Sequence, residues 1–443
     1  MIKAAREVGF LKRDGGKLKP FDFLVTLVFR ISHSFPAALS LIITFLDRPV
    51  SRSALQQKFT EKATLLLKKC LQLVMIKQFM QAKVVATPLL EYFKNVIVID
   101  SSSWDISEKL KDIFPGSGGS ASKANCKLQC AYDYKSGSIV LLEDRKGTEP
   151  DQKYSQNIVS LIQTGALFLF DLGYWCFNTF YEIASKGAYF VSRYNNIVNF
   201  WSSLNGEDIK LDLVNTLQNI QFNSVELEGY IKDDQKCKVD VRLICFRAPK
   251  AVADERKRKL RAQAKKKGRI PTKKSLLLCE WSLFITNASG EVIPGEMIRS
   301  IYRVRWSIEL IFKSWKSILR MHQCNVRNNV NRLKCELYAK LIFAVITHII
   351  HSKLHSYLWN KESRELSFDK LWKFMVSHSE SLHKAIKKSL NSFSKQVNSL
   401  LEKIIKECEK YHQKSRKTTL QMIDQMVGDS KPVKVNLSEI LKA

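Results

Sequence analysis

Two apolar segments of this chain each end in an aspartate, at Val-Ile-Val-Ile-Asp100 and at Leu-Phe-Leu-Phe-Asp171. Short continuous apolar runs of this kind are typical of buried β-strands. An aspartate at a strand end is often only a turn former, so neither carboxylate alone indicates a function. Together they place two acidic side chains at strand ends, an arrangement that can contribute to a metal site.

A third carboxylate, Glu309, belongs to a regularly spaced polar pattern, Tyr302-x2-Arg305-x3-Glu309-x6-Lys316. On a single helix, at about 100° per residue, these four positions fall within a sector of roughly 60°. The apolar residues of the segment fall on the neighbouring face, where they can pack on a core. Three carboxylates flanked by Tyr, Arg and Lys indicate a Mg²⁺ site with phosphate-binding residues, and hence phosphodiester chemistry on nucleic acid.

The pattern resembles the signature of the DDE transposases of bacterial insertion sequences, specifically the insertion-sequence-four family, at all four positions and all three spacings. The resemblance extends from about residue 51 to about residue 354 and implies a ribonuclease-H-like core in which Asp100, Asp171 and Glu309 are catalytic. The sequence around these residues also resembles that of the family, at Asp171-Leu-Gly-Tyr, Gly187-Ala-Tyr-Phe-Val-Ser-Arg193 and Tyr302-Arg-Val-Arg-Trp-Ser-Ile-Glu309.

The implied cofactor is a pair of divalent ions. Two-metal phosphoryl transfer needs carboxylates that hold two ions roughly 3.5–4 Å apart. Oxygen ligands without Cys or His favour Mg²⁺ or Mn²⁺ over Zn²⁺. Asp100 would bridge both ions, and Asp171 and Glu309 would each complete one of them. Asp105 lies past the expected strand end and is not selected.

Tyr302, Arg305 and Lys316 carry groups that bind phosphate: a hydroxyl, a bidentate guanidinium and a point charge. An ordinary solvated helix face is the alternative, and the stripe shared with Glu309 argues against it.

Two tryptophans near this motif have different expected roles. Trp306 is expected in the core. Trp281 lies at the place where relatives that cleave through a DNA hairpin stack a tryptophan on a flipped base. A core position on a strand is the equal alternative for Trp281.

The charge balance favours a polyanionic partner. The 443 residues include 72 Lys and Arg against 42 Asp and Glu, a net charge of +30, and such an excess attracts DNA. A ribosome-associated or merely soluble basic protein is the alternative.

The ten cysteines show no zinc spacing and are expected to be reduced, mostly buried thiols. Without a signal peptide or a membrane span, a bacterial cytoplasmic, nucleoid-associated protein is expected.

Residues 1–85 are expected to form a helical DNA-binding domain. Helices are predicted at residues 35–46 and 62–81, and a helix between them starts at a capping box, Ser53-x-x-Gln56. This arrangement is typical of a helix-turn-helix-like DNA-binding motif. A plain helical bundle is the alternative. Matching family members recognise the DNA ends with this region, which favours the DNA-binding motif.

A ribonuclease-H-like core is expected at residues 86–200 and a β-rich insertion at residues 201–292. Within the insertion, residues 256–274 hold eleven Lys or Arg and no acidic residue. Such a run is typical of a solvated, partly disordered segment, and phosphate binding explains it equally well. Strands are predicted at residues 96–100, 126–132, 138–142, 167–171, 188–193, 225–231, 238–246 and 276–286, with a helix at residues 152–163.

Residues 293–330 are expected to carry the catalytic core helix, and residues 331–443 a C-terminal domain that is helical to its end. Family analogy suggests subunit contact for this domain, and a purely structural role is the alternative. His348, His351 and His355 share one helix face, but no Cys, Asp or Glu completes a metal set there.

The combined interpretation is a mixed α/β DNA transposase that binds terminal inverted repeats and target DNA, both double-stranded, as a homodimer. It would cut and rejoin strands, with a hairpin intermediate as one route. Two alternatives stay open: a ribonuclease-H-like nuclease without strand transfer, and a decayed or repurposed DNA-binding protein without catalysis. The intact carboxylates Asp100, Asp171 and Glu309 argue against decay.

Overall fold

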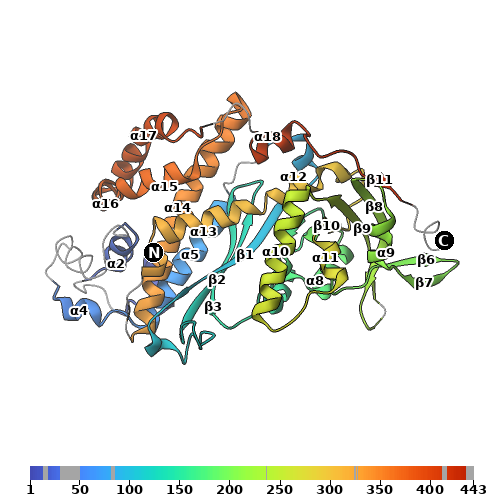
Figure 1. Ribbon diagram of the computed structural model, residues 1–443. Coiled ribbons are helices and arrows are strands. Elements are labelled where there is room, and N and C mark those ends of the chain that lie inside the picture. The colour runs from blue at the N-terminus through green and yellow to red at the C-terminus, as the bar shows by residue number, and fades with distance from the viewer. Residues whose placement is uncertain are drawn as a thin grey trace. The chain divides into compact units, whose positions relative to one another are not determined.

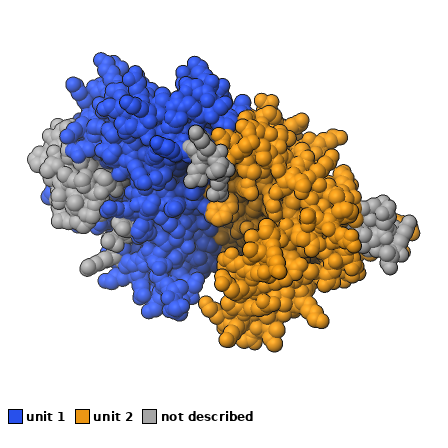
Figure 2. Space-filling model, turned by 45° about the horizontal axis from the view of Figure 1, so that its top comes forward, with its two compact units in different colours: residues 1–86, 100–149, 307–415 blue, residues 87–99, 150–306, 416–443 orange. Residues whose placement is uncertain are grey.

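The computed structural model describes residues 1–12, 18–29, 50–80, 85–235, 237–323, 326, 328–411 and 417–435. The chain divides into two compact units (Figure 2). Unit 1 contains residues 1–86, 100–149 and 307–415, and unit 2 contains residues 87–99, 150–306 and 416–443. Strand β1 (Val96–Asp105) contributes to both, because the boundary falls between Ile99 and Asp100. No helix in the described part of the chain has the length and apolar content needed to cross a membrane.

Long helices dominate unit 1 (Figure 1). The longest, α14 (Val330–Glu362), packs along α5 (Glu61–Met80) and α2 (Pro20–Phe29). It begins where the Asn329 side chain accepts a hydrogen bond from a backbone N–H, and it ends where Ser363 adopts a left-handed conformation. Unit 1 also contains α1 (Ile2–Glu7), α4 (Arg52–Gln56), α15 (Phe368–Ser377), α16 (Ser379–Lys388), α17 (Leu390–Glu407) and α13 (Trp306–Ser317) from its second residue.

The helix predicted at residues 62–81 is confirmed as α5. The start of α4 differs from the prediction, because its N-cap is Ser51, whose Oγ accepts a hydrogen bond from Ala54 N at 3.1 Å. The expected capping box is therefore wrong: Ser53 and Gln56 both lie inside α4. The helix expected at residues 35–46 and the turn after it lie outside the described residues.

The strands β3, β2 and β1, in that order, form one end of the single sheet of the described chain, and unit 1 holds β2, β3 and the second part of β1. β2 (Asn125–Asp133) and β3 (Ser138–Lys146) form an antiparallel hairpin. In their turn Gly137 has a φ of 67°, and a Cβ added there would lie 2.6 Å from the Ser352 Cβ on α14. Only glycine meets both conditions without strain, so the hairpin can approach the helix closely.

Unit 2 holds the other strands (Figure 1). β1 is parallel to β4 (Leu167–Phe170), with Val98 opposite Leu169. β4 is parallel to β5 (Tyr189–Arg193), and α8 (Phe177–Ser185) is the helical crossover that a parallel connection requires. Beyond β5 the order continues through antiparallel pairs: β10 (Trp281–Thr286), β9 (Lys238–Arg247), β8 (Ser224–Lys232), β6 (Trp201–Leu204) and β7 (Glu207–Lys210).

The mixed α/β class with a β-rich insertion is confirmed by this order of elements, while the bounds of the five expected domains stay predictions. The helix expected at residues 152–163 is only α7 (Asp151–Tyr154) followed by a 3₁₀ segment, Ser155–Leu161. Residues 276–286 are not one strand, because α11 (Lys273–Leu278) precedes β10. A leucine run fits either a strand or a short helix, and the Thr272 cap favours the helix.

Two further segments differ from expectation. The basic run is not an irregular segment, because α10 (Lys250–Lys266) covers its first part; Lys, Arg and Ala are good helix formers. The chain after α17 is not helical to its end, since α18 (Thr419–Asp424) is followed by extended chain and strand β11 (Val433–Lys434). The cysteines in the described residues are free thiols and most are buried, as expected.

Candidate active site

Asp100 and Glu309 lie on the same cavity of unit 1. Asp100 is on β1, and its Oδ1 accepts a hydrogen bond from Ser101 N at 2.8 Å. Glu309 is in the first turn of α13. The cavity has a volume of about 480 Å³ and is lined by Asp100, Ser101, Ser102, Glu309, Phe312, Lys313, Lys316, Ser317 and His322. Unit 1 thus brings together two of the three expected carboxylates, although they are far apart in sequence.

Lys316 connects the end of α13 to β1. Its Nζ donates a hydrogen bond to the Ser103 backbone carbonyl at 3.0 Å. Partial burial lowers the pKa of the Lys316 ammonium, because desolvation disfavours the charged form. Lys316 therefore places a cation on the same cavity as Asp100 and Glu309.

Asp171 belongs to unit 2, where it directly follows β4. Its Oδ1 accepts a long hydrogen bond of 3.4 Å from the Tyr302 hydroxyl on α12 (Ile298–Arg303). Tyr302 is buried, and burial raises the pKa of its hydroxyl to about 12, an effect that Arg305 partly offsets. The hydroxyl therefore keeps its proton at neutral pH and can donate it in a hydrogen bond.

Arg305 and Arg193 place positive charge around Tyr302. Arg305 is only 5% exposed, and its guanidinium carbon lies 5.7 Å from the centre of the Tyr302 ring. The guanidinium carbon of Arg193 lies 6.0 Å from the same ring. Arg193 is the last residue of β5. Because Phe170 lies opposite Ser192 in the pairing of β4 with β5, the next residues along the two strands, Asp171 and Arg193, are neighbours. Arg193 is not part of the polar motif in the sequence, and its place at the end of an apolar strand is the one signal that indicates it.

The polar motif does not lie on one continuous helix. α12 ends at Arg303 and α13 begins at Trp306. Val304 N bonds to Ile301 O and Arg305 N to Tyr302 O, so the connection is tightened by i→i−3 hydrogen bonds. The single-helix stripe is therefore wrong: Tyr302 and Arg305 belong to unit 2, whereas Glu309 and Lys316 belong to unit 1.

The two tryptophans differ from each other in exposure. Trp281 is 3% exposed on β10, and the Arg247 guanidinium carbon lies 4.6 Å from the centre of one of its rings. Trp306 is 55% exposed, so its expected core position is wrong. Both line a unit 2 cavity of about 920 Å³ whose walls also carry Arg193 and Tyr302. The stacking role of Trp281 stays a prediction.

The remaining candidates have structural partners. Asp105 lies within β1 rather than beyond it, and it accepts a hydrogen bond from Asn125 Nδ2 at 2.9 Å. His351 and His355 are partly buried on α14, where they contact the backbone of Leu366. In the described residues no group of three or more His, Cys, Asp or Glu side chains is arranged to hold a metal ion. The oxygen donors Asp100 and Glu309 on one cavity nevertheless suit Mg²⁺ or Mn²⁺.

Comparison with known proteins assigns the chain to a class of enzyme. The family model described as Transposase DDE domain matches residues 91–346, more than half of the chain. The chain therefore belongs to the DDE transposase family of insertion sequences. It is similar to the transposase for insertion sequence element IS231E of Bacillus thuringiensis subsp. finitimus, with 28% identity over 95% of this chain and 91% of that protein.

Other relatives extend the comparison. The transposase for insertion sequence element IS1151 of Clostridium perfringens is 26% identical over 82% of this chain and 80% of that protein. A solved structure of the piggyBac transposase synaptic complex with hairpin DNA aligns with a TM-score of 0.42 and 9% identity, covering 90% of this chain and 80% of that chain.

Proposed function

We propose that this transposase cuts and rejoins double-stranded DNA at the terminal inverted repeats of its own element, in a metal-dependent reaction. The observation that carries the proposal is that Asp100 and Glu309 line one cavity together with Lys316. Membership of the transposase family supports the reaction class. The chain's net charge of +30 supports a DNA partner.

The residues that we propose to be catalytic and to hold the metal are Asp100, Asp171 and Glu309. Bound Mg²⁺ or Mn²⁺ would supply an activated water or 3′-hydroxyl and a stabilised leaving oxygen. The strand register supports the grouping: β1 and β4 are parallel, and each carries its aspartate two residues beyond the Val98–Leu169 pair. Ligands of α/β proteins commonly bind at the carboxyl ends of parallel strands.

Four side chains are proposed to hold the DNA phosphates. Arg305 and Arg193 offer planar guanidinium groups for bidentate contacts, and Lys316 offers a point charge. Tyr302 would donate its single hydroxyl proton to Asp171 before DNA binds and to a neighbouring phosphate oxygen in the DNA complex.

The outer face of α10 is the proposed surface for the DNA backbone. Arg256 and Lys257 fix the helix from its inner side: Arg256 Nη1 donates to Trp281 O at 3.1 Å, and Lys257 pairs with Glu280 at 2.6 Å. The outer side carries a stripe of three exposed cations, which fall within roughly 60° on the helix: Arg258, Arg261 and Lys265. A rigid row of cations suits sequence-independent phosphate contacts.

Two finer features belong to the same proposal. Cleavage proceeds through a DNA hairpin in which Trp281 stacks on a flipped base. Two copies of the chain act on two DNA ends, so that each end has its own set of carboxylates. A mass measurement of the protein with and without end DNA tests the second feature.

The function is tested with linear DNA that carries the terminal repeats of the element, labelled target DNA, and Mg²⁺, Mn²⁺ or EDTA. Sequencing gels separate nicked, hairpin, fully cut and joined products. Metal-dependent cutting at the repeats followed by joining is the expected result. Cutting without joining would indicate a nuclease, and binding without cutting a non-catalytic protein; either outcome overturns the proposal.

A further inference from the structure

The chain returns to unit 2 after α14 to α17, through residues 417–435, which we name the strap. It starts with α18, where Thr418 and Gln421 form a capping box, and it ends in β11. α18 packs on α12 and on α6 (Pro88–Glu91). The strap therefore contacts the short helix that carries Tyr302.

Polar contacts join the strap to α12 and to the turn before it. They involve both ends of α12, so the helix is held along its length. The contacts are Arg299 Nη1 to Asp429 Oδ1 at 3.0 Å, Ser300 Oγ to Val427 O at 3.1 Å, Asp429 N to Glu296 O at 2.9 Å, and Arg303 Nη1 to Met422 Sδ at 3.1 Å.

Two glycines let the strap and the turn before α12 pack closely. A Cβ added at Gly428 would lie 2.6 Å from Glu296 O, which is backbone and cannot rotate away. A Cβ added at Gly295 would lie 2.6 Å from Glu226 Oε2 and 3.0 Å from Pro432 Cγ. The position of the strap is therefore fixed by close backbone packing as well as by side-chain contacts.

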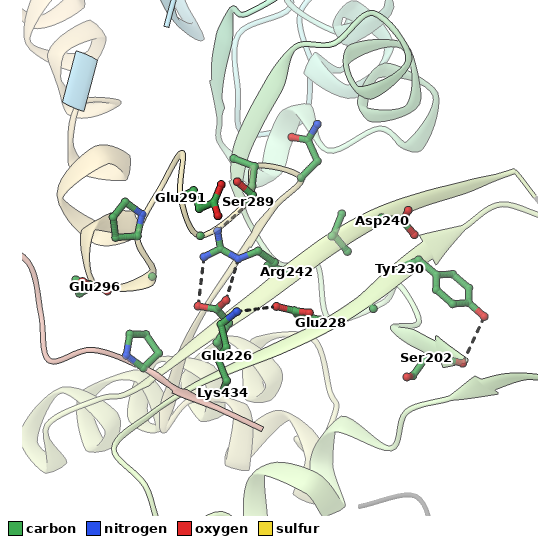
Figure 3. Close-up of a pocket in the computed structure, with 18 of the residues that line it drawn as sticks. Ser202, Glu226, Glu228, Tyr230, Asp240, Arg242, Ser289, Glu291, Glu296 and Lys434 are labelled. Carbon is green, nitrogen blue, oxygen red and sulfur yellow. Dashed lines mark hydrogen bonds and ion pairs between the residues drawn. The ribbon is translucent and has the colours of Figure 1, made fainter. Parts of the chain in front are cut away.

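The far end of the strap is fixed to the sheet. β11 pairs in parallel with β8, and Lys434 Nζ lies 3.0 Å from Glu228 Oε1 (Figure 3). Beneath it the buried pair of Arg242 and Glu226 is joined at 2.9 Å. The strap forms one wall of a cavity of about 1150 Å³ that these residues line. Its two ends are thus anchored on different elements, α12 and β8.

α12 needs such support. It has six residues, and its N-cap Met297 makes no side-chain capping bond. Isolated helices shorter than roughly 12 residues are marginal in water, so a helix of this length is held mainly by tertiary packing. Tyr302, which bonds to Asp171, lies in the last turn of α12.

We propose that the strap is a positioning element: it holds α12 so that Tyr302 meets Asp171, with Asp429 and Gly428 as the positioning residues. This inference rests on the proposed function, because it assigns Asp171 to the catalytic site. The alternative is that the strap only adds stability to unit 2.

The test uses the full chain with Asp429→Ala, Asp429→Glu, Gly428→Ala and the exchanged pair Arg299→Asp/Asp429→Arg. The control is Asp369→Ala, which breaks the exposed 2.7 Å pair with Lys373 on α15. Four quantities are measured: cleavage rate at saturating end DNA, end affinity, melting temperature, and hydrogen exchange of the α12 amides. The exchange measurement needs no catalysis.

Asp429→Ala and Gly428→Ala should speed exchange in α12 and slow cleavage about two- to tenfold, no more than loss of the Tyr302 hydroxyl itself, with end affinity unchanged. Asp429→Glu and the exchanged pair should restore part of the rate. Normal α12 exchange in both variants, or a parallel fall in rate, affinity and melting temperature, would overturn the inference. If the wild type fails to cut, the proposed function fails, and α12 exchange still decides whether the strap holds α12.

Discussion

The Tyr302 hydroxyl and the Asp171 carboxylate face each other across 3.4 Å within unit 2. The contact joins a helix to the carboxyl end of a parallel strand, two segments separated by more than a hundred residues. Because burial raises the pKa of Tyr302 to about 12, the tyrosine keeps its proton at neutral pH and is the donor of this pair.

Tyr302→Phe should slow cleavage while leaving the fold intact. A single hydrogen bond contributes about 0.5–1.5 kcal/mol, which corresponds to a two- to tenfold slower step. Single-turnover cleavage of end DNA measures the effect. Tyr181→Phe, an exposed tyrosine of α8, is the matched control and should cut at the normal rate. A normal rate for Tyr302→Phe as well would remove the hydroxyl from the mechanism.

Asp100→Asn, Asp171→Asn and Glu309→Gln should each abolish cleavage with DNA-end affinity almost unchanged. The carboxylates are proposed to hold metal, whereas Lys and Arg supply most of the affinity. Asp105→Asn, which alters a neighbouring β1 carboxylate, serves as the control. Any one of the three variants cutting at the wild-type rate would exclude that residue from the site.

DNA affinity should fall steeply with salt, and α10 should account for part of the slope. Each phosphate contact contributes about 0.9 to the slope of log affinity against log salt. Replacing Arg258, Arg261 and Lys265 with alanine should lower the slope by up to roughly 3. Fluorescence anisotropy across a salt series measures it. An unchanged slope in the triple variant would show that DNA does not follow α10.

Trp281→Ala separates two roles that predict different outcomes. If the side chain stacks on a flipped base, worth about 1–3 kcal/mol, hairpin formation should slow roughly 5- to 150-fold while the first nick does not. If it only packs β10, stability should fall by about 3–5 kcal/mol and every step should suffer together. Gels on a pre-nicked end and a melting curve decide. Trp306→Ala, which alters an exposed ring on the same cavity, should leave the melting temperature nearly unchanged.

Acid should destabilise unit 1 through its buried histidines. Burial lowers the pKa of His348 to about 3 and that of His355 to about 4. Both are neutral in the folded state, while the unfolded chain takes up protons below its ordinary pKa of about 6.5. The stability they contribute is therefore complete above pH 6.5 and lost as pH falls toward 4, by at most about 1.4 kcal/mol per pH unit for each histidine. Urea unfolding between pH 4.5 and 7.5 measures this.

His348→Gln should flatten that pH dependence, because one buried titrating group is gone. His378→Gln, at the end of α15, is the control and should keep the wild-type slope. Equal slopes for wild type and His348→Gln would show that another group causes any acid sensitivity.

The features that the sequence predicts well are long or continuous segments without a break. β1 and β4 are continuous apolar runs with an acidic end, and α5 and α14 are long segments without proline or glycine. The break between α12 and α13 could not be read, because Val304 and Arg305 fit the same helical period whether the helix continues or tightens into i→i−3 bonds. β11 has only two residues and no period at all.

Unit 2 is built from segments that are far apart in the sequence, and this affects when it can fold during synthesis. Asp100, Asp171 and Glu309 all leave the ribosome before residues 417–435. At about 5–20 residues per second, the roughly 120 residues between Glu309 and β11 take on the order of 6–25 s to synthesise. During that interval β8 has no β11 beside it and α12 has no α18. A nascent chain therefore carries all three proposed catalytic carboxylates for about 6–25 s before the strap can pack, so folding of unit 2 is delayed relative to its own synthesis.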